Sequence, residues 1–146
     1  MRSILGREPI ERFMKTDPVT VPPWIPVNEF VEDYVYRYHH KLFPVVNDSN
    51  NLLGYVTTNE VKNLPKEEWS RRTVQEITQP CSEENTAAPE TDAQQALQRM
   101  TRSGIGRLMV VKENRLLGII ALKDLLGFLS TKIDIEGYGA LDHSRL

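Results

Sequence analysis

Apolar residues recur along the chain in two similar patterns, one in each half. Pro26–Val31 aligns with Asp92–Leu97 at an offset of 66 residues, and Leu53–Val56 aligns with Leu117–Ile120 at an offset of 64. The offset falls by two because the second copy has a polar loop two residues shorter than the loop of the first copy, Asn47–Asn51. Self-similarity at a nearly fixed offset indicates an internal repeat, so we expect two copies of a unit of about 60 residues.

Each copy is predicted to have the element order β-α-β-β-α, introduced by a short opening turn or helix. In the first copy the predicted elements are the opening turn 10–14, the extended segment 19–21, a helix through 27–38, strands 42–46 and 53–57, and a helix over 58–64. In the second copy they are 74–77, 86–88, a helix through 93–100, strands 108–111 and 116–121, and a helix over 122–130. This order predicts the α+β fold class.

Helical spacing of apolar residues places Tyr34 and Tyr38 on the core-facing side of the first helix, with Tyr36 on another face. The corresponding helix of the second copy is predicted to begin with a capping box formed by Thr91 and Gln94.

The repeats suggest five segments along the chain. They are a leader at 1–8, a first repeat at 9–64, a polar linker at 65–72, a second repeat at 73–130 and a tail at 131–146. One repeat is too small to bury a generous core alone. We therefore expect the two repeats to pack together about a pseudo-two-fold axis.

Composition excludes several classes of protein. The 146 residues carry a net charge of −2, which gives no overall attraction to nucleic acid. A single cysteine, Cys81, excludes an internal disulfide framework and favours a reduced compartment. No apolar run approaches the roughly 20 residues that a membrane helix needs. The expected location is cytoplasmic, either free or as the cytosolic part of a membrane protein, without direct membrane insertion.

The sequence also lacks a recognisable catalytic or metal-binding constellation. The three histidines are His39, His40 and His143, and neighbouring side chains on a helix point about 100° apart, so His39 and His40 would not share a metal. There is no Gly-x-Ser-x-Gly motif and no phosphate-binding loop. We expect a protein that is not an enzyme and holds no metal.

Ordered motifs in both halves resemble a known family. The strand–glycine–helix segments Leu53–Glu60 and Leu117–Asp124, with the preceding strands Leu42–Val46 and Arg107–Val111, resemble a tandem pair of CBS domains, also called a Bateman module. The segment Val61–Trp69 resembles the linker of CBS pairs at the cytosolic end of site-2-protease-like intramembrane zinc metalloproteases. The chain contains no His-Glu-x-x-His motif, so it has no protease chemistry of its own.

The resemblance implies a regulatory module without an obligatory cofactor. Many CBS pairs bind AMP, ADP, ATP or S-adenosylmethionine in clefts between the repeats. The positions that match the family's adenine slot are Thr20, Val21, Leu42, Phe43, Pro44, Thr86, Ala87, Leu108 and Met109. The positions that match its ribose and phosphate contacts are Thr57, Glu60, Asp124, Lys41, His40 and Arg107.

Each repeat departs from the family's Thr/Ser-x-x-Asp pattern at one position. Glu60 is one methylene longer than the usual aspartate, and Ala121 stands where a hydroxyl is expected. Thr57 and Glu60 also have the spacing of a capping box, which is a purely structural alternative.

The resulting hypothesis is a non-catalytic regulatory module that senses an adenosyl ligand in the inter-repeat cleft. It is expected to form a homodimer and to control a fused or associated protein, such as a membrane metalloprotease. The alternative is a structural dimerisation module that binds no ligand. A nucleic-acid-binding accessory domain is disfavoured by the net charge of −2.

Overall fold

The chain divides into two compact units that do not follow the order of the sequence. The computed structural model describes residues 8–136, so most of the expected leader and residues 137–146 of the expected tail lie outside the described residues. Within the described residues, unit 1 contains residues 8–17, 82–112 and 117–136, and unit 2 contains residues 18–81 and 113–116. The first segment of the chain therefore belongs to the unit that is built mainly from the second repeat.

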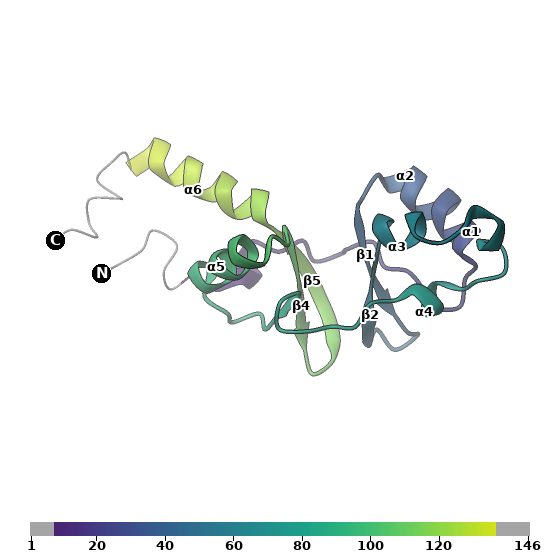
Figure 1. The fold of residues 1–146 in the computed structure, drawn as a ribbon. Coiled ribbons are helices and arrows are strands. Elements are labelled where there is room, and N and C mark those ends of the chain that lie inside the picture. The colour runs from purple at the N-terminus through teal and green to yellow at the C-terminus, as the bar shows by residue number, and fades with distance from the viewer. Residues whose placement is uncertain (1–7, 137–146) are drawn as a thin grey trace. The chain divides into compact units, whose positions relative to one another are not determined.

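Unit 2 is organised around an antiparallel hairpin (Figure 1). Strand β1 (Leu42–Val46) pairs with strand β2 (Leu52–Thr57), with a register irregularity between Val45 and Val46. An isolated parallel bridge between Val21 and Val45 adds a third extended segment beside β1. The predicted strand–loop–strand order is confirmed here.

The long helix of unit 2 contains a π-helical stretch in its middle. It comprises α1 (Val27–Phe30), the π-helical segment η2 (Val31–Val35) and α2 (Tyr36–Tyr38). Wider π-helical turns shift the phase of the side chains that follow. Tyr38 is consequently 37% exposed, so its predicted place in the core was wrong, although Tyr34 does pack against the core.

Backbone groups from the linker begin this helix, because Pro26 offers no capping side chain. The N–H of Val27 donates to the Arg72 carbonyl at 2.8 Å, and the N–H of Asn28 donates to the Trp69 carbonyl at 3.2 Å. These bonds satisfy N–H groups that a helix start leaves without partners. The linker is thus an integral part of unit 2.

The remaining elements of unit 2 are short helices. They are α3 (Thr58–Lys62), the 3-10 helix η3 (Lys66–Glu68) and α4 (Val74–Ile77). The core beneath them is aliphatic with one aromatic pair, and its buried members are Val21, Ile25, Val27, Phe30, Val31, Phe43, Val45, Val56, Val61 and Val74.

Unit 1 contains a three-stranded sheet and two longer helices (Figure 1). Its elements are the 3-10 helix η1 (Ile10–Arg12), β3 (Thr86–Ala87), α5 (Ala93–Ser103), β4 (Arg107–Lys112), β5 (Arg115–Ala121) and α6 (Leu122–Glu136). The tip of the β4–β5 hairpin, residues 113–116, belongs to unit 2. Strand β4 is the middle strand, and β3 lies parallel to it. The predicted α+β class is confirmed in both units.

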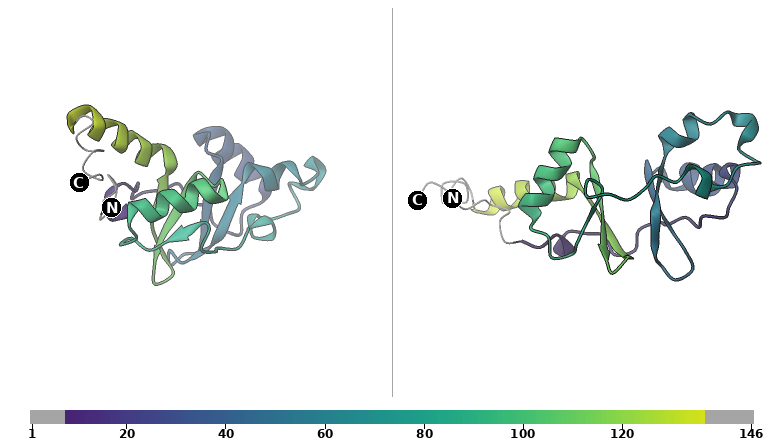
Figure 2. Two further views of the ribbon diagram at one scale, coloured as in Figure 1. Left: turned by 60° about the vertical axis from the view of Figure 1, so that its left-hand side comes forward. Right: turned by 60° about the horizontal axis from the view of Figure 1, so that its bottom comes forward.

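Two helix boundaries in unit 1 differ from the expectation. Asp92, not Thr91, is the N-cap of α5, and its carboxylate accepts from the N–H of Gln94 at 2.9 Å. Aspartate caps a helix as well as threonine does, and Asp92 stands one residue closer than Thr91 to the first helical residue, Ala93. Helix α6 follows β5 directly, as the left view of Figure 2 shows. It runs to Glu136, six residues past the predicted end.

The opening helices are exchanged between the units. Ile10, from the start of the first repeat, is fully buried in the unit 1 core with Met100, Leu108 and Leu125. Val74, from the start of the second repeat, is fully buried in the unit 2 core. Apolar periodicity predicts that both residues are buried, but it does not indicate which core receives them.

A glycine in the second strand of each hairpin makes this exchange sterically feasible. The N–H and carbonyl of Tyr55, next to Gly54, pair with Gln79 at 3.0 and 2.7 Å, and those of Ile119, next to Gly118, pair with Lys15 at 3.0 and 2.8 Å. A Cβ on Gly54 would meet the Gln79 carbonyl oxygen, and one on Gly118 would meet that of Lys15, both closer than 3.0 Å. Since these contacts involve backbone atoms, neither side can rotate away.

No helix among the described residues, 8–136, is long and apolar enough to cross a bilayer.

We predict that Gly54→Ala destabilises the protein by about 1–3 kcal/mol, because the added methyl group forces apart a paired backbone. Gly127→Ala is the matched control, since Gly127 lies within α6 and its Cβ would meet nothing within 4 Å. That change should stabilise the protein by about 0.5–1 kcal/mol. Urea unfolding of both variants checks the pair, and equal free energies of unfolding would contradict the close-approach argument.

Candidate ligand-binding site

The site residues predicted in the first repeat gather at one end of β1 in unit 2. Leu42, the first residue of β1, pairs in register with Thr57, the last residue of β2. The N–H of Thr58, which begins α3, donates to the Lys41 carbonyl at 3.2 Å. The N–H of Val21 donates to the Pro44 carbonyl at 2.9 Å, which brings the extended segment alongside. The start of α3 therefore lies next to the start of β1.

Most of the predicted adenine-slot side chains in unit 2 point into the protein. Val21, Phe43 and Pro44 are buried, while Thr20 and Leu42 are half-buried. The Phe43 ring makes edge contact with Phe30, with ring centroids 5.2 Å apart. Buried side chains cannot contact a ligand, so this segment can offer a ligand chiefly its backbone groups.

Aromatic and basic side chains surround the residues before β1. The His40 ring stacks on Tyr38 at 6.1 Å and packs on Phe43 at 5.8 Å between centroids. Arg37 lies over the Tyr38 ring at 5.3 Å, and Lys41 is exposed. Arg37 and Lys41 thus bring two positive charges to the short segment that precedes β1.

Tyr34 belongs to the same aromatic group but sits deeper. Burial, together with the nearby Glu29 carboxylate, raises the pKa of the Tyr34 phenol. The hydroxyl therefore stays protonated at neutral pH and serves packing, in agreement with the predicted core role.

Thr57 and Glu60 form the capping box that their spacing predicts as the structural alternative. The N–H of Thr57 donates to Glu60 Oε1 at 2.6 Å, and the Thr57 hydroxyl donates to the same oxygen at 2.9 Å. The N–H of Asn59 donates to Thr57 Oγ1 at 3.2 Å. Thr57 and Glu60, two of the four ribose and phosphate positions predicted in this repeat, are thus engaged in starting α3.

In unit 1 the extended segment and the following strand are again adjacent. Thr86 and Ala87 pair in parallel register with Met109 and Val110. Ala87, Leu108 and Met109 are buried and Thr86 is half-buried, so backbone groups again dominate. The guanidinium of Arg99 donates to the Thr86 carbonyl at 3.2 Å. The sequence does not predict this contact, because helical periodicity does not show which partner a long polar side chain reaches.

Asp124 and Arg107 occupy the corresponding corner of unit 1. The N–H of Leu122, the first residue of α6, donates to the carbonyl of Gly106 at 2.8 Å, which brings the start of α6 against the start of β4. Asp124 and Arg107 are both half-buried. Among the described residues, 8–136, the Asp124 carboxylate has no hydrogen bond or ion pair. Ala121, the residue before the helix, has no hydroxyl, so it cannot donate a hydrogen bond to Asp124 as Thr57 does to Glu60.

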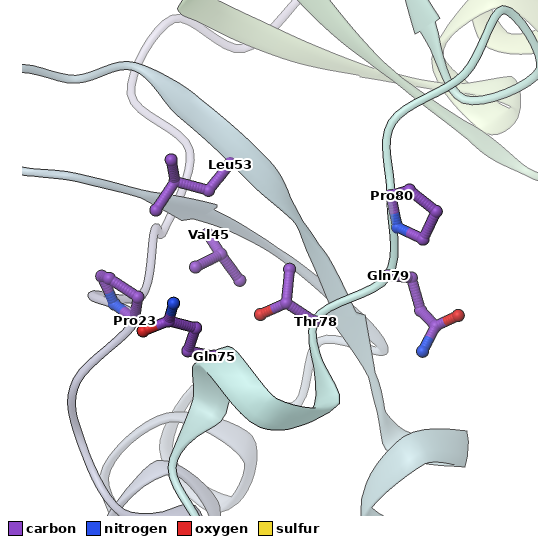
Figure 3. A pocket seen from close by; sticks show the side chains of 7 residues that line it. All are labelled: Pro23, Val45, Leu53, Gln75, Thr78, Gln79 and Pro80. Atoms are coloured by element: carbon purple, nitrogen blue, oxygen red, sulfur yellow. The ribbon is translucent and has the colours of Figure 1, made fainter.

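A separate pocket in unit 2 has different chemistry. It has a volume of about 330 Å³ and is lined by Pro23, Val45, Leu53, Gln75, Thr78, Gln79 and Pro80, as Figure 3 shows. None of these residues is charged, and none is a predicted site residue. A phosphate would find no cationic partner in this lining, so the pocket is a poor candidate for a nucleotide.

Other chemistry is not supported by the described residues. No group of three His, Cys, Asp or Glu side chains among residues 8–136 is placed to hold a metal ion. Desolvation raises the pKa of the Cys81 thiol, which lowers its thiolate fraction at neutral pH.

We predict that Thr57→Ala lowers the free energy of unfolding by about 1 kcal/mol, because α3 loses its N-cap. Thr101→Ala is the control: that hydroxyl bonds only to carbonyls of its own helix, α5, at exposed positions. The control should stay within about 0.5 kcal/mol of the parent. Thermal and urea unfolding measure both; an unchanged Thr57→Ala variant would contradict the capping role.

Comparison with known proteins agrees with the repeat. The CBS domain family model matches residues 10–66 and 74–131. A protein of Mycobacterium tuberculosis named as a zinc metalloprotease, Rip3, is 27% identical over 113 residues, covering 77% of this chain and 29% of its own length. Another named as a zinc metalloprotease, sll0528 of Synechocystis, is 24% identical over 137 residues, covering 89% of this chain and 36% of its own. The chain thus spans about a third of these relatives.

Solved structures show the same fold. The protein named as acetoin utilization protein AcuB, from Vibrio cholerae, superposes with a TM-score of 0.75 at 19% identity, covering 88% of this chain and 94% of that one. The CBS domain of a bacterial CNNM/CorC family Mg²⁺ transporter, solved in complex with ATP, has a TM-score of 0.71 at 20% identity, covering 91% and 90%. With two matched segments that together span most of its length, the chain belongs to the CBS domain family and carries two CBS domains.

Proposed function

We propose that the chain is a non-catalytic regulatory module that binds an adenosyl ligand and controls a fused or associated protein. The ligand class is AMP, ADP, ATP or S-adenosylmethionine. The observation that carries the proposal is that each unit brings an extended segment, the start of a strand and the start of a helix to one corner. The ATP complex of the CNNM/CorC CBS domain supports the choice of an adenine nucleotide.

The site residues proposed from the resemblance fall into two sets, one in each unit. Unit 2 holds the set from the first repeat, and unit 1 holds the set from the second. The segment boundaries 9–64 and 73–130 are likewise proposed as the limits of the two repeats.

The output of the module is proposed to pass through unit 1. The segment before Pro18 and helix α6 both belong to this unit, so both ends of the described chain meet there. They touch each other where Phe13 packs on Phe128, with ring centroids 4.8 Å apart. A ligand regulates only by binding two states with different affinity, and a contact between the two end segments is a place where such states could differ.

The controlled protein is proposed to be a membrane metalloprotease or another effector. Support comes from Rip3 and sll0528, which are named as zinc metalloproteases and are about three times longer than the matched region. In that setting the module works as a cytoplasmic homodimer, with no contact to nucleic acid and no insertion into the bilayer.

A second candidate function is a structural dimerisation module without a ligand. The closed Thr57–Glu60 pair and the missing hydroxyl at Ala121 favour it, because each removes one contact of the family pattern.

Calorimetric titration and thermal unfolding with AMP, ADP, ATP and S-adenosylmethionine separate the two candidates. A regulatory module should release or absorb heat with at least one of them and gain about 2.7 kcal/mol of stability at a hundredfold excess over Kd. Guanosine monophosphate and inorganic phosphate are the controls for adenine and for phosphate alone. No heat and no thermal shift at millimolar concentrations of all four ligands would contradict the regulatory proposal and favour the structural one.

A further inference from the structure

We propose that the uncharged pocket of unit 2 binds a small neutral molecule that has an apolar ring and an amide group. This ligand is distinct from an adenosyl ligand, so the inference goes beyond the proposed function and does not depend on it. The pocket has a volume of about 330 Å³, which falls within the range of about 300–1,000 Å³ that small-molecule sites occupy.

The pocket lies away from the corner where α3 begins. Leu53, which lines the pocket, is the second residue of β2, whereas Thr57, which caps α3, is the last residue of that strand. Four residues of a strand span about 13 Å, so the two places lie near opposite ends of β2. None of the predicted adenosyl contacts is among the lining residues. A molecule in the pocket would therefore leave the corner free.

Backbone hydrogen bonds hold the walls of the pocket together. The N–H of Gln75 donates to the Pro23 carbonyl at 2.9 Å, which ties α4 to the extended segment. The N–H groups and carbonyls of Tyr55 and Gln79 pair at 3.0 and 2.7 Å, which ties the segment after α4 to β2. Because the walls are already ordered, a ligand would not have to immobilise them on binding.

The apolar part of the lining suits an uncharged ring. Its side chains are Pro23, Val45, Leu53 and Pro80. Val45 is fully buried, whereas Leu53 is 46% exposed, so a ligand that covers Leu53 removes apolar surface from water. No lining residue is charged, so nothing in the pocket compensates the desolvation of an ionised ligand.

The polar part of the lining suits an amide. The carboxamide of Gln75 can both donate and accept, and it has no hydrogen bond within residues 8–136. The Thr78 hydroxyl donates its proton to the Val74 carbonyl at 2.8 Å, so it can only accept from a ligand. Figure 3 shows the Gln79 side chain pointing away from the other lining side chains. An amide supplies the matching groups, a carbonyl for Gln75 and an N–H for the Thr78 oxygen.

The occupied pocket would strengthen the exchange between the repeats. The lining residues up to Leu53 come from the first repeat, and those from Gln75 onward come from the second. A molecule bound between them stabilises the folded state by mass action. The backbone pair of Tyr55 and Gln79 joins the same two segments, so its N–H groups should exchange with solvent more slowly when the ligand is bound.

The test is a titration of the full chain with benzamide, followed by protein NMR and amide hydrogen exchange. Benzoate and benzamidine are matched probes, because they have nearly the same shape but carry a negative and a positive charge. Toluene has the ring without the amide. We expect benzamide to bind at millimolar concentrations and to slow exchange of the Tyr55 and Gln79 N–H groups. The other three probes should bind about tenfold or more weakly.

Two variants at exposed positions locate the binding. Gln75→Glu adds a negative charge at the pocket with little change of shape, so it should reverse the preference and bind benzamidine more tightly than benzamide. Leu53→Trp should fill the pocket and abolish binding of benzamide. Leu126→Trp is the matched control, since Leu126 is also 46% exposed but lies on α6 in unit 1, and it should bind benzamide as the parent does.

Urea unfolding shows whether each variant is folded, and Gln75→Glu gives an independent reading if Leu53→Trp folds poorly. No binding of benzamide, equal binding of benzamide and toluene, or equal binding of the neutral and charged probes would overturn the inference. Unchanged benzamide binding by a folded Leu53→Trp variant would do the same. Each of these results leaves the adenosyl proposal standing, because that ligand is titrated separately.

Discussion

The architecture depends on two close backbone approaches, each of which requires a glycine. Gly54 admits the carbonyl of Gln79, and Gly118 admits that of Lys15. At each point a pair of backbone hydrogen bonds ties the opening segment of one repeat to a strand of the other repeat. The opening helices then bury Ile10 and Val74 in cores to which they do not belong by sequence. Neither unit could be completed by one repeat alone.

This exchange bears on function because it assigns both ends of the described chain to unit 1. The opening segment meets α6 through Phe13 and Phe128, and α6 begins at the corner that holds Asp124 and Arg107. Unit 2 differs because its capping box closes the equivalent corner. The duplicated motif thus has two different outcomes. In unit 2 the carboxylate of Glu60 is engaged in the capping box. In unit 1 the carboxylate of Asp124 has no partner among the described residues.

Much of this was predictable from residue patterns. The repeat, both hairpins and the α+β class follow from periodicity and turn residues, because strands and helices impose spacings of two and 3.6 residues on buried side chains. The start of α5 was misplaced by one residue, since Thr91 and Asp92 are both good caps. Tyr38 was misplaced because a π-helical stretch carries no apolar signature of its own. Arg99 was missed because a long polar side chain has no pattern that reveals its partner.

Sequence by itself determined most of the buried positions, which turns close the hairpins, and which positions resemble the CBS family's contacts. It also determined that Thr57 and Glu60 could cap a helix while Ala121 could not. Only the tertiary structure decided which core each opening helix enters, and that the Thr57 proton goes to Glu60. The reason is physical: spacing along a chain records how a side chain faces its own element, whereas pairing between distant segments depends on which backbones can approach closely enough to form hydrogen bonds.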